Sequence, residues 1–236
     1  MPRRPRGLLF DYGGTLVEEL EFNARAGIDV LIRAANPPLT VDVDIVIARA
    51  DRVTREIAER RDLMQIETPW ASLTRLIHDC FGTSFALPLE DLELEFWNAS
   101  VTTQPRPGVR HALSEFSRCG IPMGVVSNSS FGERIIRHEL AKHGLADGLR
   151  AIVVSAEYAV RKPNPLLFEA AAGLLGVAPA DVWFVGDRFD TDVVGARAAG
   201  MTPFLYAPTP STDHRHPDVI SGDWADFERH FCEAIA

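Results

Sequence analysis

The chain has 236 residues, with 33 acidic and 24 basic side chains and a formal net charge of −9. This length fits one large domain, or a core with a smaller inserted domain, and it allows a full hydrophobic core. The acidic balance argues against a nucleic-acid-binding surface, and no run approaches the roughly 18 apolar residues of a membrane span.

The first six residues, MPRRPR, are basic, but no long apolar run follows them. We therefore expect neither a signal peptide nor a membrane anchor. Three scattered cysteines, Cys80, Cys119 and Cys232, form neither a disulfide framework nor a zinc-binding pattern. Together these features predict a cytoplasmic protein.

Short apolar runs alternate with helix-like stretches over much of the chain. The runs predict strands at Gly7–Phe10, Pro122–Val126, Ala151–Val154, Val182–Val185 and Pro203–Tyr206. Helical spacing predicts helices at Val109–Arg118, Gly132–His143, Pro165–Leu175 and Thr191–Ala199, most of them ending at a glycine. Continuous apolar strands are typical of sheets covered on both faces. The alternation predicts an α/β fold with a doubly wound parallel sheet.

Residues 17–103 follow a different pattern, without a comparable strand run. Helical spacing occurs at Val43–Arg60 and Trp70–Cys80. We expect a core domain of residues 1–16 and 104–236, with a helical cap domain inserted at 17–103 and a hinge at Gln104–Gly108. A loop at His214–Pro217 and a last helix near Trp224–Ile235 complete the prediction.

Ligands of doubly wound sheets bind at the carboxyl ends of the strands, and four polar groups follow predicted strands or loops there. The first is Asp11, followed by Gly13, Gly14 and Thr15. A carboxylate in this position can face a phosphoryl group, and the glycines allow close backbone approach. The alternative is an ordinary Asp-Gly turn after a strand.

The second group is Ser127-Asn128-Ser129, which precedes a predicted helix and suits phosphate oxygens, although helix N-capping explains it as well. The third surrounds Lys162, one of only two lysines in the chain. An ammonium at this point can neutralise both Asp11 and a phosphate. The alternative is a solvated loop lysine.

The fourth group contains Asp187, Asp190 and Asp192 after the strand Val182–Val185. Carboxylates clustered near Asp11 would repel one another unless a cation is present, and such an oxygen-rich site suits Mg²⁺. Turn formation and helix capping are the alternatives, and we prefer capping for Asp190.

In order and spacing, these groups resemble the motifs of the haloacid dehalogenase-like (HAD) superfamily. The matching segments read DYGGTL, VVSNSS, RKPNP and GDRFDTDVVGARAAGM. The resemblance covers Gly7–Phe10 and about Pro105–Tyr206, and the helical insertion sits where a C1-type cap belongs. It implies a HAD-like Rossmannoid core with an inserted α-helical cap.

The resemblance also implies roles for particular residues. Asp11 would attack phosphorus and form an aspartyl phosphate, with Lys162 orienting it. Thr15, Ser127 and Asn128 would bind the substrate. Mg²⁺ would be held by Asp11, the backbone carbonyl of Gly13, Asp187 and Asp192, with Asp192 either a direct ligand or adjacent to one.

One family carboxylate is missing. The motif D-x-D-G-T normally supplies a second Asp as general acid/base, and Gly13 stands in its place. Losing such a group typically lowers the rate by about 10²–10⁴. We expect a phosphatase that acts on a small phosphorylated metabolite. Either the leaving group of that metabolite departs easily, as in an acyl or aryl phosphate, or another residue of the enzyme supplies the acid. Glu18, Glu19 and, less favourably, Tyr12 could supply that acid, although a solvated helix start explains the two glutamates more simply.

Other functions are consistent with part of this pattern. One is a catalytically weak or inactive HAD-like protein that binds a phosphorylated ligand or a protein partner. A dehalogenase-type or phosphonatase-type enzyme is disfavoured by the intact acidic cluster and by the absence of lysine from residues 17–103. A receiver domain is disfavoured by the chain length, the insertion and the nucleophile on the first strand. In the cap, Arg49, Arg52, Trp70 and His78 could touch substrate, but such residues are more often surface or core.

Overall fold

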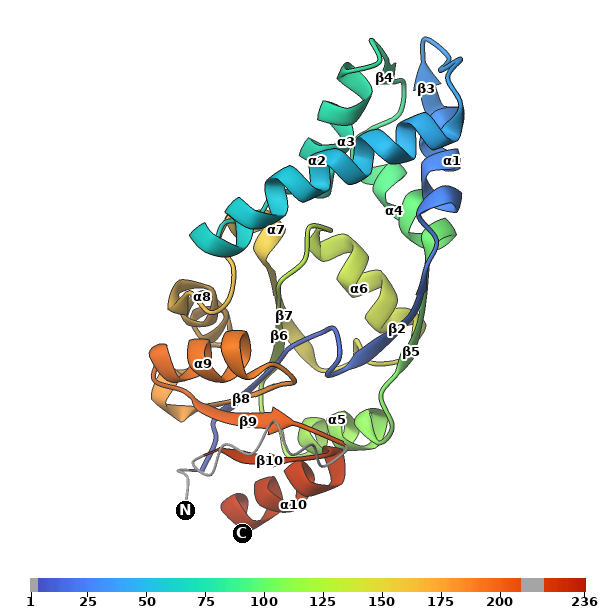
Figure 1. Cartoon of the computed structure of the whole chain (residues 1–236). Coiled ribbons are helices and arrows are strands. Elements are labelled where there is room, and N and C mark those ends of the chain that lie inside the picture. Colours follow the sequence, from blue (N-terminus) through green and yellow to red (C-terminus); the bar gives the residue numbers. More distant parts are fainter. Residues whose placement is uncertain (1–3, 209–218) are drawn as a thin grey trace.

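A computed structural model describes residues 4–208 and 219–236. Its centre is a six-stranded sheet with the order β10-β9-β8-β1-β6-β7, in which every neighbouring pair is parallel (Figure 1). The strands are β1 (Gly7–Phe10), β6 (Met123–Ser127), β7 (Leu149–Val154), β8 (Val182–Gly186), β9 (Thr202–Tyr206) and β10 (Ile220–Gly222). The predicted doubly wound α/β class is confirmed. Five strands match the predicted runs within two residues, and β10 was not predicted.

The central strand β1 is buried on both faces because it lies between β6 and β8 and helices cover both sides of the sheet. Leu8 and Phe10 belong to a hydrophobic cluster with α5 (Val109–Arg118), α6 (Glu133–Lys142) and α10 (Trp224–Ile235). Leu9 points the other way, into a cluster with α8 (Pro165–Leu175) and α9 (Val194–Ala198). This alternation explains why β1 reads as a continuous apolar run.

Most predicted helices of the core are confirmed within one residue at each end. The exception is Thr191–Ala199, which is a π-helical turn, η2 (Phe189–Val193), followed by the short α9. π turns are rare and occur frequently at functional sites. The remaining core elements are α7 (Ser155–Tyr158) and the 3₁₀ turn η1 (Pro179–Asp181). The glycines predicted to end helices, Gly120, Gly144, Gly176 and Gly200, all have positive φ.

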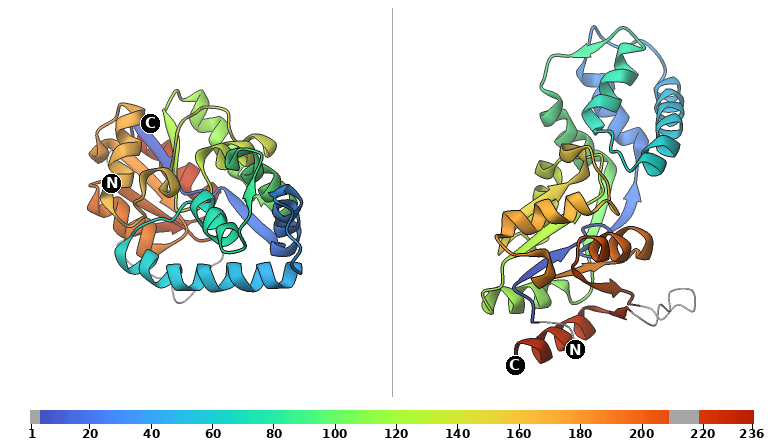
Figure 2. Two further views of the ribbon diagram at one scale, coloured as in Figure 1. Left: turned by 90° about the horizontal axis from the view of Figure 1, so that it is seen from above. Right: turned by 90° about the vertical axis from the view of Figure 1, so that its left-hand side faces the viewer.

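Residues Val17–Pro105, which we call the insertion, stand beyond the carboxyl ends of the core strands (Figures 1 and 2). They form α1 (Ala24–Ala34), α2 (Val43–Met64), α3 (Trp70–Asp79) and α4 (Leu89–Ser100), with strands β2 (Val17–Phe22), β3 (Ala35–Asn36), β4 (Ser84–Phe85) and β5 (Val101–Pro105). The helices predicted at Val43–Arg60 and Trp70–Cys80 are confirmed. These helices enclose their own hydrophobic cluster, which includes Trp70 and Phe96.

The prediction that this segment lacks strands is wrong, as is the helix start proposed at Glu18 and Glu19. β2 and β5 pair as an antiparallel ribbon that connects the core to the helices, and Gln104 of the expected hinge belongs to β5. The ribbon is half-exposed, and Glu18–Phe22 carries mainly polar residues. Because it buries little apolar surface, it produces no apolar run that a sequence pattern could reveal.

Contacts between α4 and the residues just before α6 fasten the insertion to the core. The Glu93 carboxylate accepts a hydrogen bond from the backbone N–H of Gly132 at 3.0 Å, and Trp97 packs against Phe131 with a ring separation of 4.8 Å. That residues 17–103 act as a separate cap domain stays a prediction. The loop predicted at His214–Pro217 lies outside the described residues. None of the helices in residues 4–208 and 219–236 combines the length and apolar character needed to cross a bilayer.

Gly195 sets the close approach of α9 to α8 and to the loop at Pro163. A Cβ at this position would collide with the Phe168 ring and lie 3.0 Å from the Pro163 Cα. We expect Gly195→Ala to lower the free energy of unfolding by about 1–3 kcal/mol, as overpacked cores do. Gly173, on the exposed side of α8, has open space around its Cα, so Gly173→Ala should raise it by about 0.5–1 kcal/mol. Urea denaturation measures both, and equal effects would contradict the packing argument.

Candidate functional site

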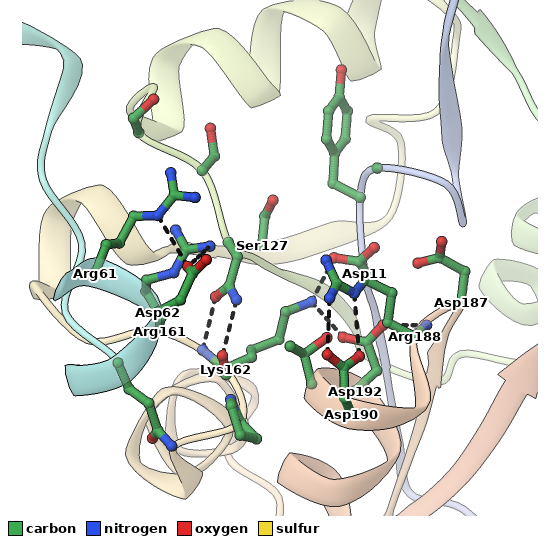
Figure 3. A pocket seen from close by; sticks show the side chains of 18 of the residues that line it. Asp11, Arg61, Asp62, Ser127, Arg161, Lys162, Asp187, Arg188, Asp190 and Asp192 are labelled. Atoms are coloured by element: carbon green, nitrogen blue, oxygen red, sulfur yellow. Dashed lines mark hydrogen bonds and ion pairs between the residues drawn. The ribbon is translucent and has the colours of Figure 1, made fainter. Parts of the chain in front are cut away.

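The predicted site residues converge because three neighbouring strands end at one edge of the sheet. Asp11 directly follows β1, Ser127 ends β6, and Asp187 follows β8. Lys162 reaches the same point from the loop before α8 (Figure 3). These side chains line a cavity of 750 Å³ between the core and the insertion. Ligand-binding cavities typically have about 300–1,000 Å³.

Lys162 lies at the centre of the charged cluster. Its side chain is buried, with Nζ 2.5 Å from Asp11 Oδ1 and 2.7 Å from Asp192 Oδ1. Burial alone would lower the pKa of Lys162, but the adjacent Asp11 and Asp192 carboxylates outweigh it and raise that pKa. The lysine therefore remains an ammonium.

The side chain of Asn128 holds the Lys162 backbone in place. Its Nδ2 donates to the Lys162 carbonyl at 3.0 Å, and its Oδ1 accepts from the Lys162 N–H at 2.8 Å. The amide is thus engaged on both ends, which favours a positioning role. Substrate contact by Asn128 stays a prediction, and it would have to involve atoms other than those in the two hydrogen bonds to Lys162.

Two glycines let the carboxylates approach the backbone closely. A Cβ on Gly14, whose φ is +79°, would collide with the Asp187 carboxylate. A Cβ on Gly186 would collide with the carboxylate of Asp192, which also accepts a hydrogen bond from the Arg188 N–H at 3.0 Å. The glycines of the DYGGT and GDRFD segments therefore have a specific steric reason.

The electrostatics of the site suit a divalent cation. Asp11, Asp187 and Asp192 offer oxygens within 4.8 Å of one another, and Lys162 balances only one of the three charges. Burial raises the pKa of Asp11 to about 7, with Asp192 and Asp187 adding to the effect and Lys162 opposing it. Burial also raises the pKa of Asp187. The raised pKa values show that burial and repulsion between the clustered carboxylates oppose their ionisation without a cation, and their hard oxygen donors suit Mg²⁺.

The other predicted residues differ in their access to the cavity. Ser127 is buried and lines it, as does Gly13. Thr15 is fully buried, with Oγ1 3.5 Å from both Asp11 Oδ2 and Asp187 Oδ1, and it is absent from the cavity wall. Its position favours support of the two carboxylates, and substrate binding by Thr15 stays a prediction.

The space beside Gly13 is open. A Cβ built on this residue would meet nothing within 4 Å. Of the possible substitute acids, Glu18 is turned toward Arg106, at 3.1 Å, and is not part of the cavity wall. Glu19 and Tyr12 do line the cavity, and the Tyr12 hydroxyl is buried without a hydrogen-bond partner in the described structure.

Several residues of the cavity wall were not predicted from sequence. Arg61 and Asp62 come from the end of α2, and Gln65 follows that helix. Arg161, which directly precedes Lys162, lies beside Arg61 and Asp62 in the wall (Figure 3). Of these four residues, only Arg161 could have been expected in the site from the sequence, because it stands next to Lys162. The others come from the insertion, where no motif marks them. Asp190 lies at the rim, where it pairs with Arg188 at 2.8 Å.

A buried carboxylate of the insertion connects this wall to the core. Glu67 accepts hydrogen bonds from the Arg161 guanidinium and, at 2.7 Å, from the Ser155 hydroxyl. Ser155 Oγ in turn accepts from the Ser129 N–H at 2.9 Å. The insertion is therefore bonded directly to Arg161, the residue before Lys162, and through Ser155 to Ser129, which follows Ser127 along the chain.

Comparisons with known proteins identify the family. The model of the haloacid dehalogenase-like hydrolase family matches residues 5–200, and the chain belongs to that family. The phosphoglycolate phosphatase of Pectobacterium atrosepticum is 27% identical over 94% of this chain and 90% of its own length. The glyceraldehyde 3-phosphate phosphatase of Methanopyrus kandleri is 37% identical over 42% of this chain and 41% of its own length.

The relatives differ in how much of their length this chain matches. The chain spans less than half of the Methanopyrus protein and of the phosphoserine phosphatase of Thermus thermophilus, which is 32% identical over 50% of this chain and 47% of its own length. A solved 2-haloacid dehalogenase from Pseudomonas syringae pv. Tomato DC3000 superposes over 100% of both chains with a TM-score of 0.64 at 20% identity. That similarity shows the shared fold.

Metal binding can be tested through stability. At 100 times its dissociation constant, a cation that binds only the folded state adds about 2.7 kcal/mol, or about 5–10 °C in Tm. We expect Mg²⁺ to produce such a rise in thermal unfolding. Asp187→Asn should remove most of it, because one of three clustered carboxylates is lost. Asp190→Asn, which changes an exposed carboxylate three residues further along the chain, is the matched control and should retain it. Equal shifts in both variants would refute the assignment.

Proposed function

We propose that the protein is a magnesium-dependent phosphatase that acts on a small phosphorylated metabolite through an aspartyl phosphate on Asp11. The observation that carries this proposal is the contact of Asp11 with the buried Lys162, beside Asp187 and Asp192, at the floor of a ligand-sized cavity. The phosphatase names of the curated relatives support it. We further propose that the insertion is a C1-type cap and that DYGGT is a variant nucleophile motif.

In the proposed reaction, a carboxylate oxygen of Asp11 attacks phosphorus and the bond from phosphorus to the leaving oxygen breaks. Water then attacks the phosphorus of the aspartyl phosphate, the bond from phosphorus to the Asp11 oxygen breaks, and the proton of the water passes to the departing phosphate or to solvent, which restores the Asp11 carboxylate. The Lys162 ammonium stabilises the ionised nucleophile, and Ser127 donates to a phosphate oxygen. Asp11, Asp187, Asp192 and the Gly13 carbonyl would hold Mg²⁺. When bound, the ion neutralises negative charge on the phosphoryl group.

The absence of a carboxylate at Gly13 limits the choice of substrate. An alkoxide needs a proton as it leaves, whereas an acyl or aryl oxygen leaves readily without one. We therefore propose acyl or aryl phosphates as the preferred substrates, with Glu19, Tyr12 or water supplying any proton. The open space at Gly13 also favours a second candidate, a catalytically weak protein that binds a phosphorylated ligand. Both candidates involve a small ligand in the cytoplasm, without nucleic acid or membrane.

Turnover of an aryl phosphate separates these two candidates. With Mg²⁺, 4-nitrophenyl phosphate should be hydrolysed, and Asp11→Asn should reduce kcat by at least about 10³-fold, because removal of a nucleophile eliminates the covalent route. Acid quenching of the wild-type reaction should trap phosphate on the protein, and the variant should trap none. Binding of phosphate esters without turnover across a panel would instead support the second candidate.

Gly13 offers a gain-of-function test because an added side chain meets no obstacle. We expect Gly13→Asp to raise kcat for an alkyl ester such as glycerol phosphate by about 10²–10⁴, the usual contribution of a general acid. Its effect on the rate at which 4-nitrophenyl phosphate forms the aspartyl phosphate should be much smaller, because that leaving group needs no proton. Gly13→Asn matches the size of the new side chain but cannot transfer a proton. If both variants behave alike in steady-state kinetics, proton supply at this position does not limit the reaction.

A further inference from the structure

We propose that a second cavity, which lies among the helices of the insertion and is partly open to solvent, receives an apolar, aromatic leaving group of the substrate. The inference rests on the proposed function and deepens it, because it names the class of substrate: phosphorylated aromatic acids or phenols. Its basis is the position, size and lining of this cavity, which is distinct from the one that contains Asp11.

The second cavity has a volume of 460 Å³ and is mainly apolar. Ile28 of α1, Val46 of α2, Trp70 of α3 and Phe96 of α4 all contribute to its wall, so each of the four helices takes part. Parts of the apolar side chains of this wall are exposed to water, and a bound apolar group would remove that apolar surface from water. The cavity is large enough for a substituted aromatic ring.

The two cavities adjoin. Arg61, Ser130 and Phe131 line both of them. In an in-line displacement the leaving oxygen lies on the side of phosphorus opposite the nucleophile. Asp11 lies at the end of β1, and the insertion stands beyond that end of the sheet (Figure 1). The leaving group of a phosphate bound at Asp11 would therefore extend toward the wall that the cavities share.

The missing acid points to the same class of substrate independently. With no carboxylate at Gly13, the leaving oxygen must be stable as an anion, and aryl and aromatic acyl oxygens have this property. They also carry an apolar group, which suits the mainly apolar lining of the second cavity. The chemistry of the leaving oxygen and the lining of the cavity thus favour the same class of substrate.

The cavity also contains one unsatisfied polar position. His78 is 1% exposed and belongs to the wall, its Nδ1 lies 3.2 Å from Thr83 Oγ1, and its Nε2 has no hydrogen-bond partner among the described residues. Buried polar atoms are nearly always paired in folded proteins. A hydroxyl or carbonyl substituent on the ring of the ligand would supply the missing partner.

The first test compares two acyl phosphates that differ in apolar size. Benzoyl phosphate and acetyl phosphate share the same reacting group, so their ratio of kcat/KM reports recognition of the acyl portion. We expect the Mg²⁺-loaded wild-type protein to prefer benzoyl phosphate by at least tenfold, mainly through KM. A ratio near one, with both compounds turned over, would overturn the inference and leave the proposed function intact.

A matched pair of substitutions on α2 locates the effect. Ala50 lines the second cavity, so Ala50→Phe should reduce the benzoyl preference at least fivefold by filling it. Ala48 lies two residues away and is exposed, so Ala48→Phe should leave the preference unchanged. Thermal unfolding verifies that both variants fold. If the two variants show the same preference as the wild type, the second cavity is not the site of recognition.

Binding provides a readout that does not require turnover. Phenylphosphonate and methylphosphonate carry the same anionic group and are not hydrolysed, and calorimetry with Mg²⁺ measures both. We expect the phenyl compound to bind at least tenfold more tightly in the wild type, with the difference lost in Ala50→Phe. Selective phenyl binding without hydrolysis of any phosphate would refute the phosphatase while supporting the apolar site. Equal binding of the two compounds would refute the apolar site.

Discussion

The site depends on one buried charge imbalance. Three carboxylates meet at the end of β1, and the Lys162 ammonium compensates only one of them. Burying unpaired charge is costly, and its cost appears as the raised pKa of Asp11. A divalent cation would bring the net charge of this cluster close to zero, and a neutral cluster can then admit an anionic phosphate. The same imbalance that opposes stability in the protein alone therefore provides the driving force for assembling a reactive complex.

Several local features of the core hold the charged cluster together. Gly14 and Gly186 admit the carboxylates of Asp187 and Asp192, and Asn128 fixes the backbone of Lys162. The π turn at Phe189–Val193 supplies Asp192 where a regular helix was predicted. None of these features adds to the hydrophobic core. They represent local deviations from regular packing, which natural proteins tolerate chiefly at functional sites.

The core could be predicted from sequence because its strands are buried on both faces and its helices end at glycines, both of which leave strong patterns. The residues of the acidic cluster followed from their positions after those strands. The β2–β5 ribbon could not be predicted, since an exposed ribbon forms by pairing rather than by burial. Arg61 and Glu67 were missed for a related reason: their importance arises from tertiary contacts with Arg161 and its surroundings, and no local spacing encodes those contacts.

Gly13 links the two halves of the molecule. In the proposed reaction, the missing carboxylate makes catalysis depend less on protonation of the leaving oxygen and more on the intrinsic stability of that oxygen as an anion. That stability is a property of the leaving group, for which we proposed the apolar cavity of the insertion as the binding site. Selectivity by the insertion would then determine rate as well as affinity, because binding the right leaving group also selects one that departs without an acid. In this proposal, Gly13 in the nucleophile loop thereby limits the leaving groups that the four helices of the insertion would have to bind.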